Sequence, residues 1–254
     1  MNKTVYYESF TDDVVESRNQ HVHLPDGYEW VRDDVWSKVK YHLGYLLVII
    51  LAELYLRLVL KVHYRNRRLL WKYRKPGYFV YGNHTQPVGD PFIPVLACIG
   101  KRAFGIAGTA NYGIPVFGKL MPWIGALPVV ETREGRQKLS EAVERRIRER
   151  HVVFLYPEAH VWPYYTGIRP FSTSAFHYQQ QLNVPGFTLT TVYRKRRFGK
   201  KPRIEVIVNG PFRPDSTLSP RDQRQRLRDE VFQSLKENAT LSNCDFIQYI
   251  CTTK

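Results

Sequence analysis

One apolar run, residues 43–60, most constrains what this chain can fold into. It reads LGYLLVIILAELYLRLVL and contains Glu53 and Arg57, which lie four residues apart and can pair on one face of a helix. At about 1.5 Å per residue the run reaches about 27 Å, slightly less than the apolar thickness of a bilayer. A helix in the membrane interface, a single membrane span and a buried core helix all remain open. Since no other run approaches this length, a polytopic membrane protein is excluded.

Basic residues dominate the chain outside its first 40 residues. The 254 residues contain 38 Lys and Arg against 23 Asp and Glu, a formal charge of +15. Residues 1–40 hold 5 basic and 8 acidic side chains, so the other 214 residues carry +18. A basic body of this kind needs an anionic partner, such as nucleic acid, an anionic membrane surface or a phosphorylated ligand.

The basic cluster after the apolar run favours the membrane among these partners. Its members are Lys61, Arg65, Arg67, Arg68, Lys72, Arg74 and Lys75. Such a cluster binds anionic headgroups, and the positive-inside rule puts this flank on the cytoplasmic side. A solvated basic helix face is the alternative. The sequence thus predicts a polar acidic extension over 1–40, a membrane-associated helix with its basic flank over 41–75, and a globular domain over 76–254.

Strand and helix patterns alternate through that domain. Aromatic and β-branched runs predict strands over 78–81, 103–107, 126–130, 151–156, 187–193 and 204–208. Helices are predicted over 91–99 with Pro91 in the first turn, from a Thr132 cap to about 150, and from Ser219 to about 238. The stretch RKRRFGKKPR, residues 194–203, lies between two strands and predicts an exposed hairpin-like connection. This alternation predicts an α/β sheet fold.

The cysteines exclude two kinds of structure. Cys98, Cys244 and Cys251 are odd in number and widely spaced, which excludes a disulfide scaffold and fits a reducing environment. No CxxC motif or Cys/His cluster has zinc-site spacing, so no metal is expected.

The segment YGNHTQPVGDPF, residues 81–92, combines a strand end with a His and an Asp in a tight turn. His84 suits a general base because the unperturbed pKa of histidine is about 6.5. The Asp90 carboxylate would fix the imidazole tautomer and stabilise the imidazolium. Because no GxSxG nucleophile motif is present, the base would activate a substrate hydroxyl directly. The alternative is that both residues only cap the next helix.

Two charged residues follow the strand predicted at 151–156. Glu158 comes after a strand and a proline, a position where α/β sheets often hold ligands. Arg169 lies between apolar residues, and its forked donors suit a phosphate. The respective alternatives are a helix N-terminal acid and a surface charge.

The order of these motifs resembles the glycerolipid acyltransferase family, best known for the 1-acylglycerol-3-phosphate acyltransferases. Over about residues 70–210, four motifs occur in the family's order: NHxxxxxDPF, GALPV, YPE with RPF, and VPG. The resemblance implies a single acyltransferase domain over 76–254, with a mixed central sheet flanked by helices. It implies acyl transfer from acyl-CoA or acyl carrier protein to a lysophospholipid hydroxyl in phospholipid biosynthesis. 1-Acylglycerol-3-phosphate is the first candidate acceptor, and no cofactor is needed.

The resemblance also implies roles for residues, with departures from the family pattern. His84 would be the base and Asp90 its partner, although five residues separate them here where the family has four. Arg133 is the arginine nearest to the family's phosphate-contacting one, two positions late. Substrate contact is also implied for Glu158, whose motif here lacks the usual Gly and Arg. Arg169 and His160 would supply the missing donors.

These departures keep one alternative open, a catalytically decayed peripheral membrane-binding protein of the same fold. A nucleic-acid partner is not expected, because the basic segments lack the interleaved aromatic residues of a single-strand binder.

Overall fold

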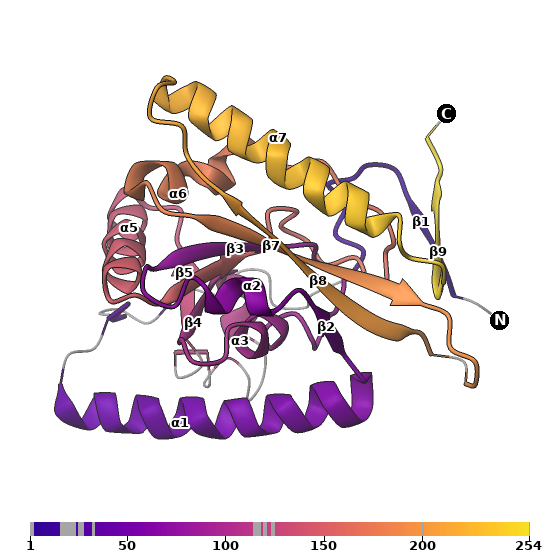
Figure 1. Ribbon diagram of the computed structural model, residues 1–254, viewed down its shortest axis with the longest axis horizontal. Coiled ribbons are helices and arrows are strands. Elements are labelled where there is room, and N and C mark those ends of the chain that lie inside the picture. Colours follow the sequence, from indigo (N-terminus) through magenta and orange to yellow (C-terminus); the bar gives the residue numbers. More distant parts are fainter. Residues whose placement is uncertain are drawn as a thin grey trace.

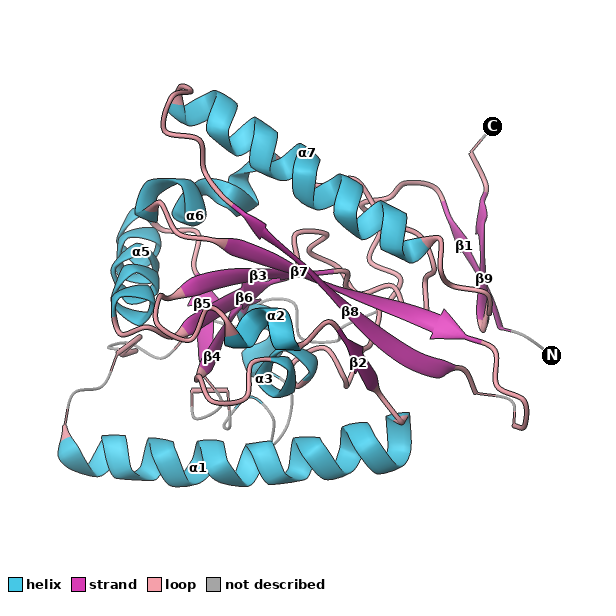
Figure 2. Cartoon of the chain, in the orientation of Figure 1, coloured by secondary structure: helices cyan, strands magenta, loops and turns pink. Residues whose placement is uncertain are grey.

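A seven-stranded mixed sheet forms the centre of the protein in a computed structural model (Figures 1 and 2). The structure describes residues 3–15, 24, 28–31, 34–113, 118, 121–122, 125–199 and 201–253. In spatial order the strands are β2 (His63–Arg65), β8 (Arg203–Phe212), β7 (Gly186–Arg194), β3 (Tyr78–Gly82), β6 (Val152–Leu155), β4 (Ala103–Gly108) and β5 (Ala126–Val129). Neighbouring strands are parallel except for the β7–β8 hairpin. The six predicted strands and the α/β fold with a mixed sheet are confirmed.

The central strands are apolar on both faces because helices cover both sides of the sheet. In β3 the side chains alternate: Tyr78 and Val80 enter one core cluster, and Phe79 and Tyr81 enter the other. The first cluster lies under α1 (Val35–Leu54), α2 (Arg68–Trp71) and α3 (Ile93–Ala97). The second lies under α5 (Arg133–Arg148), α6 (His177–Leu182) and α7 (Pro220–Ala239). The domain also contains two short 3-10 helices, Thr109–Gly113 and Thr173–Phe176.

Two predicted helices are confirmed together with their caps. The Thr132 hydroxyl accepts from the Gly135 N–H at 3.1 Å, and the Ser219 hydroxyl starts α7 in the same way. The helix predicted over 91–99 is shorter, because the N–H groups of Phe92 and Ile93 both donate to the Gly89 carbonyl and close a turn first. Pro94, and not the expected Pro91, therefore lies in the first turn of α3.

Helix α1 begins eight residues before the apolar run, where the Asp34 side chain accepts from the Ser37 N–H. It continues as a π-helix, η1 (Tyr55–Leu60), which ends at Lys61 in a left-handed conformation. The predicted Glu53–Arg57 pair forms. Residues Val35–Leu60 are long and apolar enough to cross a membrane, with a mean hydropathy of 2.1. Only 17% of an 18-residue apolar window within this stretch is buried, which does not fit the core-helix alternative.

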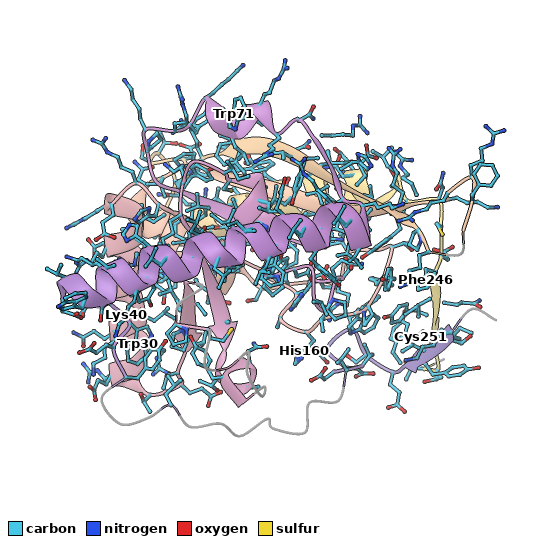
Figure 3. All side chains as sticks on the ribbon, turned by 90° about the horizontal axis from the view of Figure 1, so that it is seen from below. Trp30, Lys40, Trp71, His160, Phe246 and Cys251 are labelled. Carbon is cyan, nitrogen blue, oxygen red and sulfur yellow. The ribbon has the colours of Figure 1, made fainter. Side chains whose placement is uncertain are left out.

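Helix α1 lies flat along one side of the domain, as Figures 1 and 3 show. It docks through Tyr45, Ala52 and Leu56, which are buried. The opposite stripe is apolar and exposed, and comprises Trp36, Val39, Leu43, Leu46, Leu47, Ile50, Leu51, Leu54 and Leu58. The helix thus joins the domain by a narrow face and leaves a wide apolar face open.

A second, two-stranded sheet pairs segments from opposite ends of this sequence, and no sequence pattern predicted it. Strand β1 (Lys3–Tyr7) pairs in parallel with β9 (Ile247–Cys251), with Lys3 opposite Ile247. Thr252 also donates its N–H to the Tyr7 carbonyl at 2.9 Å. Part of the acidic extension is therefore held against the rest of the chain.

Candidate active site

The polar residues singled out in the sequence follow strands that end at one edge of the sheet. Strands β3, β6, β4 and β5 are mutually parallel, so their carboxyl ends meet there. His84 follows β3, Glu158 follows β6, and Arg133 opens the helix after β5. Strand β7 also runs parallel to β3 and ends at the same edge.

His84 and Asp90 are in contact, despite the five residues between them. Nδ1 of His84 lies 2.6 Å from Oδ2 of Asp90. The same oxygen accepts the Gln86 N–H at 2.9 Å, and the Asp90 N–H donates to the Gln86 carbonyl at 2.9 Å. These two bonds close the chain into one tight turn, which accommodates the additional residue. Burial raises the pKa of Asp90, and the bond to His84 opposes this shift.

The second ring nitrogen of His84, Nε2, has no hydrogen-bond partner among the described residues. The His84 side chain is 24% exposed, and its ring stacks on that of Tyr156 with centroids 4.6 Å apart. The Tyr156 hydroxyl donates to the Asp90 carbonyl at 2.6 Å. A Cβ on Gly82 would lie 2.5 Å from the Tyr156 ring, so the stacking depends on a glycine there. His84 is thus held at one nitrogen and free at the other.

Strand β7 holds the turn that contains His84 through buried polar groups, which the sequence did not predict. The Tyr193 hydroxyl lies 2.8 Å from Oγ1 of Thr85 and accepts from the Gln86 side chain at 2.9 Å. The Asn83 side chain pairs with the backbone of Thr191 through two bonds, at 3.0 and 2.7 Å. Polar residues within an otherwise apolar strand were the available signal.

Glu158 and Arg169 form a buried ion pair behind His84. Both side chains are 0% exposed, with Nη2 of Arg169 at 3.3 Å from Oε2 of Glu158. Oε2 also accepts the His84 N–H at 3.2 Å, and Oε1 accepts the Arg169 N–H at 3.0 Å. Burial raises the pKa of Glu158 and lowers that of Arg169, and their mutual attraction opposes both shifts. The pair braces the His84 backbone and presents no side-chain surface to a ligand.

The N-terminal segment covers this ion pair. Nη1 of Arg169 donates to the Phe10 carbonyl at 3.2 Å, and its guanidinium lies 4.8 Å from the centre of the Trp162 ring. Nε1 of Trp162 donates to the Asp12 carbonyl at 2.9 Å. Residues 10–12 therefore complete the back of the site, and no local sequence signal indicated this contact.

The other two predicted site residues lie further out. His160 is 44% exposed in its side chain, with Nδ1 at 3.7 Å from Asp13, and its carbonyl accepts from Arg169. Arg133 is exposed at the start of α5. Because β5 is three strands from β3, the ends of these two strands lie about 14 Å apart along the edge, and this separates Arg133 from His84. The structure thus joins His84, Asp90, Glu158 and Arg169 and leaves Arg133 apart.

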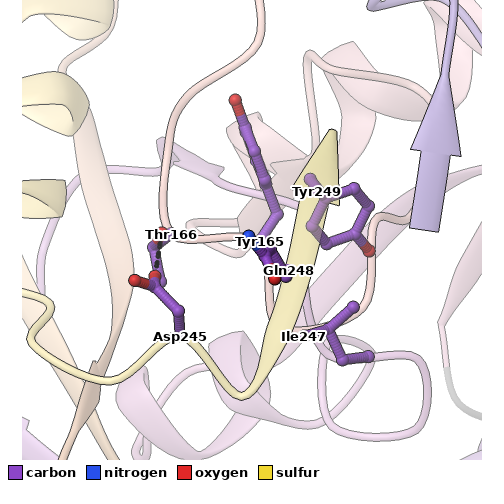
Figure 4. Close-up of a pocket in the computed structure, with 6 residues that line it drawn as sticks. All are labelled: Tyr165, Thr166, Asp245, Ile247, Gln248 and Tyr249. Atoms are coloured by element: carbon purple, nitrogen blue, oxygen red, sulfur yellow. Dashed lines mark hydrogen bonds between the residues drawn. The ribbon is translucent and has the colours of Figure 1, made fainter. Parts of the chain in front are cut away.

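A cavity of about 290 Å³ lies elsewhere, beside strand β9 (Figure 4). Its walls are Tyr165, Thr166, Asp245, Ile247, Gln248 and Tyr249. No candidate site residue lines it, so it is separate from the histidine. Within the described part of the chain, no group of three or more His, Cys, Asp or Glu side chains is placed to hold a metal ion.

Comparisons with known proteins identify the family of the chain and a similar fold. A family model described as Acyltransferase matches residues 61–193, which is more than half of the chain. The fold is similar to that of the 1-acyl-sn-glycerophosphate (LPA) acyltransferase PlsC from Thermotoga maritima, with a TM-score of 0.57 and 12% sequence identity. That match covers 84% of this chain and 86% of the other. Among curated proteins there is no significant match. The chain belongs to the acyltransferase family, and its resemblance to the glycerolipid acyltransferases is confirmed.

Proposed function

We propose that this chain transfers a fatty acyl group from acyl-CoA or acyl carrier protein to the hydroxyl of a lysophospholipid. The first candidate acceptor is 1-acylglycerol-3-phosphate, which would place the reaction in phospholipid biosynthesis. The observation that carries the proposal is the His84–Asp90 contact at 2.6 Å, with Nε2 of His84 unpartnered among the described residues. This is the arrangement that a general base needs.

In the proposed mechanism, Nε2 of His84 takes the proton of the acceptor hydroxyl as its oxygen attacks the thioester carbonyl. The tetrahedral intermediate then collapses, the carbon–sulfur bond breaks, and the thiolate leaves and takes up a proton. Asp90 holds the tautomer with the proton on Nδ1 and stabilises the imidazolium. Glu158 and Arg169 act as positioning residues, because their contacts reach the backbone of His84.

The apolar stripe of α1 supports attachment to a membrane. An amphipathic helix that lies flat buries such a stripe in the interface between headgroups and acyl chains. The turn from His84 to Asp90, called the catalytic turn below, packs against the end of this helix, since a Cβ on Gly89 would lie 3.0 Å from the Leu60 side chain. In this proposal the helix holds His84 near the membrane surface, where a lipid acceptor resides. The basic flank after Leu60 supports a cytoplasmic location in this proposal, because the cytoplasmic leaflet carries the anionic lipids that attract such clusters.

The direct test is thiol release from palmitoyl-CoA in detergent, with and without lysophosphatidate. We expect acceptor-dependent release, lowered about 10²–10⁴-fold by His84→Ala and also lowered by Asp90→Asn. His177→Ala, an exposed histidine on α6, is the matched control and should keep full activity. Circular dichroism checks that each variant is folded.

Full activity in folded His84→Ala would remove His84 from the mechanism. An absence of release from acyl-CoA and acyl carrier protein donors, across a panel of lysolipids, would favour the decayed membrane-binding protein. The spacing that motivated this alternative does not keep His84 and Asp90 apart.

A further inference from the structure

The connection between β7 and β8 concentrates positive charge, most of it without an acidic partner among the described residues. Arg194, at the end of β7, pairs with Glu205 of β8 at 3.2 Å. Five further basic residues have no ion-pair partner among the described residues: Lys195, Arg196, Arg197, Lys201 and Arg203. All of them are exposed except Arg196, which is partly buried. This connection is called the basic hairpin below.

An exposed aromatic ring occupies the tip of the basic hairpin. Phe198 is 80% exposed, the highest value among the exposed large hydrophobic residues described. Its neighbour Arg197 lies with its guanidinium 5.4 Å from the ring centre. Leaving a phenylalanine in water forgoes its burial energy, and an aromatic ring among cations suits the boundary between headgroups and acyl chains.

The strand register ties the base of the hairpin to the end of the apolar helix. Strand β2 starts two residues after Lys61, where the helix ends, and pairs in parallel with β8, with His63 opposite Glu205. Two residues before this first pair, the helix ends at Lys61 and β8 begins at Arg203. Figure 1 shows the β7–β8 turn beyond the C-terminal end of α1 and near the level of that helix. Figure 3, seen from below, also places the turn beyond that end.

The hairpin also lies at the catalytic edge of the sheet. Gly82, two residues before His84, is aligned with Leu189 of β7, and β7 continues in the same direction to Arg194. At about 3.3 Å per residue, these five further residues carry the hairpin about 17 Å past the level of Gly82. The hairpin therefore projects from the same edge of the sheet as the turn that holds His84, whereas the helix end packs against that turn through Leu60.

We propose that the basic hairpin is a second membrane contact, which inserts Phe198 among lipid headgroups and binds anionic lipid phosphates through its Lys and Arg side chains. This inference rests on the proposed membrane attachment through α1. A flat helix alone leaves the domain free to rock about the helix axis. A contact beyond the helix end holds the catalytic edge against the bilayer. An acidic carrier protein would suit the charge, but it accounts neither for the exposed ring nor for the proximity to the apolar helix.

The test measures binding to two kinds of vesicle by sedimentation, phosphatidylcholine alone and phosphatidylcholine with phosphatidylglycerol. The double variant Lys195→Gln/Arg197→Gln should bind the anionic vesicles about 25-fold more weakly, because each basic residue contributes about fivefold. Binding to phosphatidylcholine alone should hardly change. Phe198→Ser should weaken binding to both vesicles about tenfold.

The matched control is Arg221→Gln/Lys236→Gln, which removes the same two charges from exposed positions on α7. It should bind both vesicles like the unaltered protein. Acyl transfer in detergent should be the same in all these variants, because none of the changed residues belongs to the catalytic turn. That readout also shows that the variants are folded.

Three outcomes would overturn the inference. In the first, the hairpin variants bind anionic vesicles as well as the unaltered protein does, which leaves the proposed acyltransferase function intact. In the second, they keep vesicle binding and lose binding to acyl carrier protein, which assigns the hairpin to the donor. In the third, the unaltered protein binds neither vesicle, which also removes attachment through α1. Failure of the acyltransferase proposal itself would appear separately, as absent thiol release in detergent.

Discussion

Replacing Arg169 with methionine should destabilise the protein strongly. The change leaves Glu158, whose side chain is 0% exposed, with two backbone N–H donors and no countercharge. Removing one partner of a buried ion pair costs about 3–5 kcal/mol, because the remaining charge stays buried and uncompensated. A domain of this kind has a total stability of about 5–15 kcal/mol, so the loss is a large fraction of it.

The double variant Glu158→Gln/Arg169→Met should recover most of this loss. Glutamine has the shape of glutamate, can accept from the His84 N–H, and carries no charge that needs a partner. Neutral replacements of buried ion pairs are often close to neutral in stability. The recovery distinguishes an uncompensated charge from a simple loss of packing.

Urea unfolding at pH 7, followed by circular dichroism, measures both effects. The exposed Arg226, which pairs with Asp215 and Glu230, is the matched control, and Arg226→Met should cost less than about 1 kcal/mol. The reasoning fails if Arg169→Met costs no more than this control. It also fails if the double variant is less stable than Arg169→Met alone.

Three further predictions concern the catalytic turn and pH. Gly82→Ala brings a methyl group 2.5 Å from the Tyr156 ring, so the kcat of thiol release should fall and the free energy of unfolding should decrease by about 1–3 kcal/mol. The control Gly108→Ala places its methyl group in open space and should change neither quantity. Tyr193→Phe removes the hydroxyl that fixes the turn and should lower the unfolding free energy by about 1–3 kcal/mol in urea. Burial lowers the pKa of His151 to about 4, whereas the pKa in the unfolded chain is about 6.5. Because the unfolded chain therefore binds a proton more readily, the folded state loses stability as the pH falls from about 6.5 to about 4. His151→Gln should flatten the decline in urea midpoint between pH 6.5 and 4, and an unchanged decline would contradict this.

The sequence predicted those elements whose signals are local. A strand buried on both faces must be apolar throughout, and this is why runs such as YFVY could be recognised. The caps at Thr132 and Ser219 lie next to the helices that they start. The beginning of α1 was missed because its first turns contain Lys38, Lys40 and His42 and do not read as apolar.

What could not be predicted depends on contacts between distant residues. The sequence pattern placed Glu158 after a strand and indicated a phosphate contact for Arg169. Whether such a pair faces a ligand or the interior depends on what covers it, and here the cover comes from Phe10, 159 residues before Arg169 in the chain. Similarly, β1 and β9 are short strands that pair with each other, so neither segment could be recognised as a strand without knowledge of its partner.

The pairing of β1 with β9 has a consequence for the order in which the protein is made. Lys3–Tyr7 is held by residues that are synthesised much later, because its pairing has to wait for Ile247–Cys251. Contacts of such long sequence separation form late, since the chain entropy of closing the loop must be lost before they contribute. The central sheet, in contrast, is assembled from strands up to Phe212. On the ribosome, the cover over Arg169 would therefore close only after the sheet and α7 have emerged, and a nascent chain would carry His84 on an unfinished support.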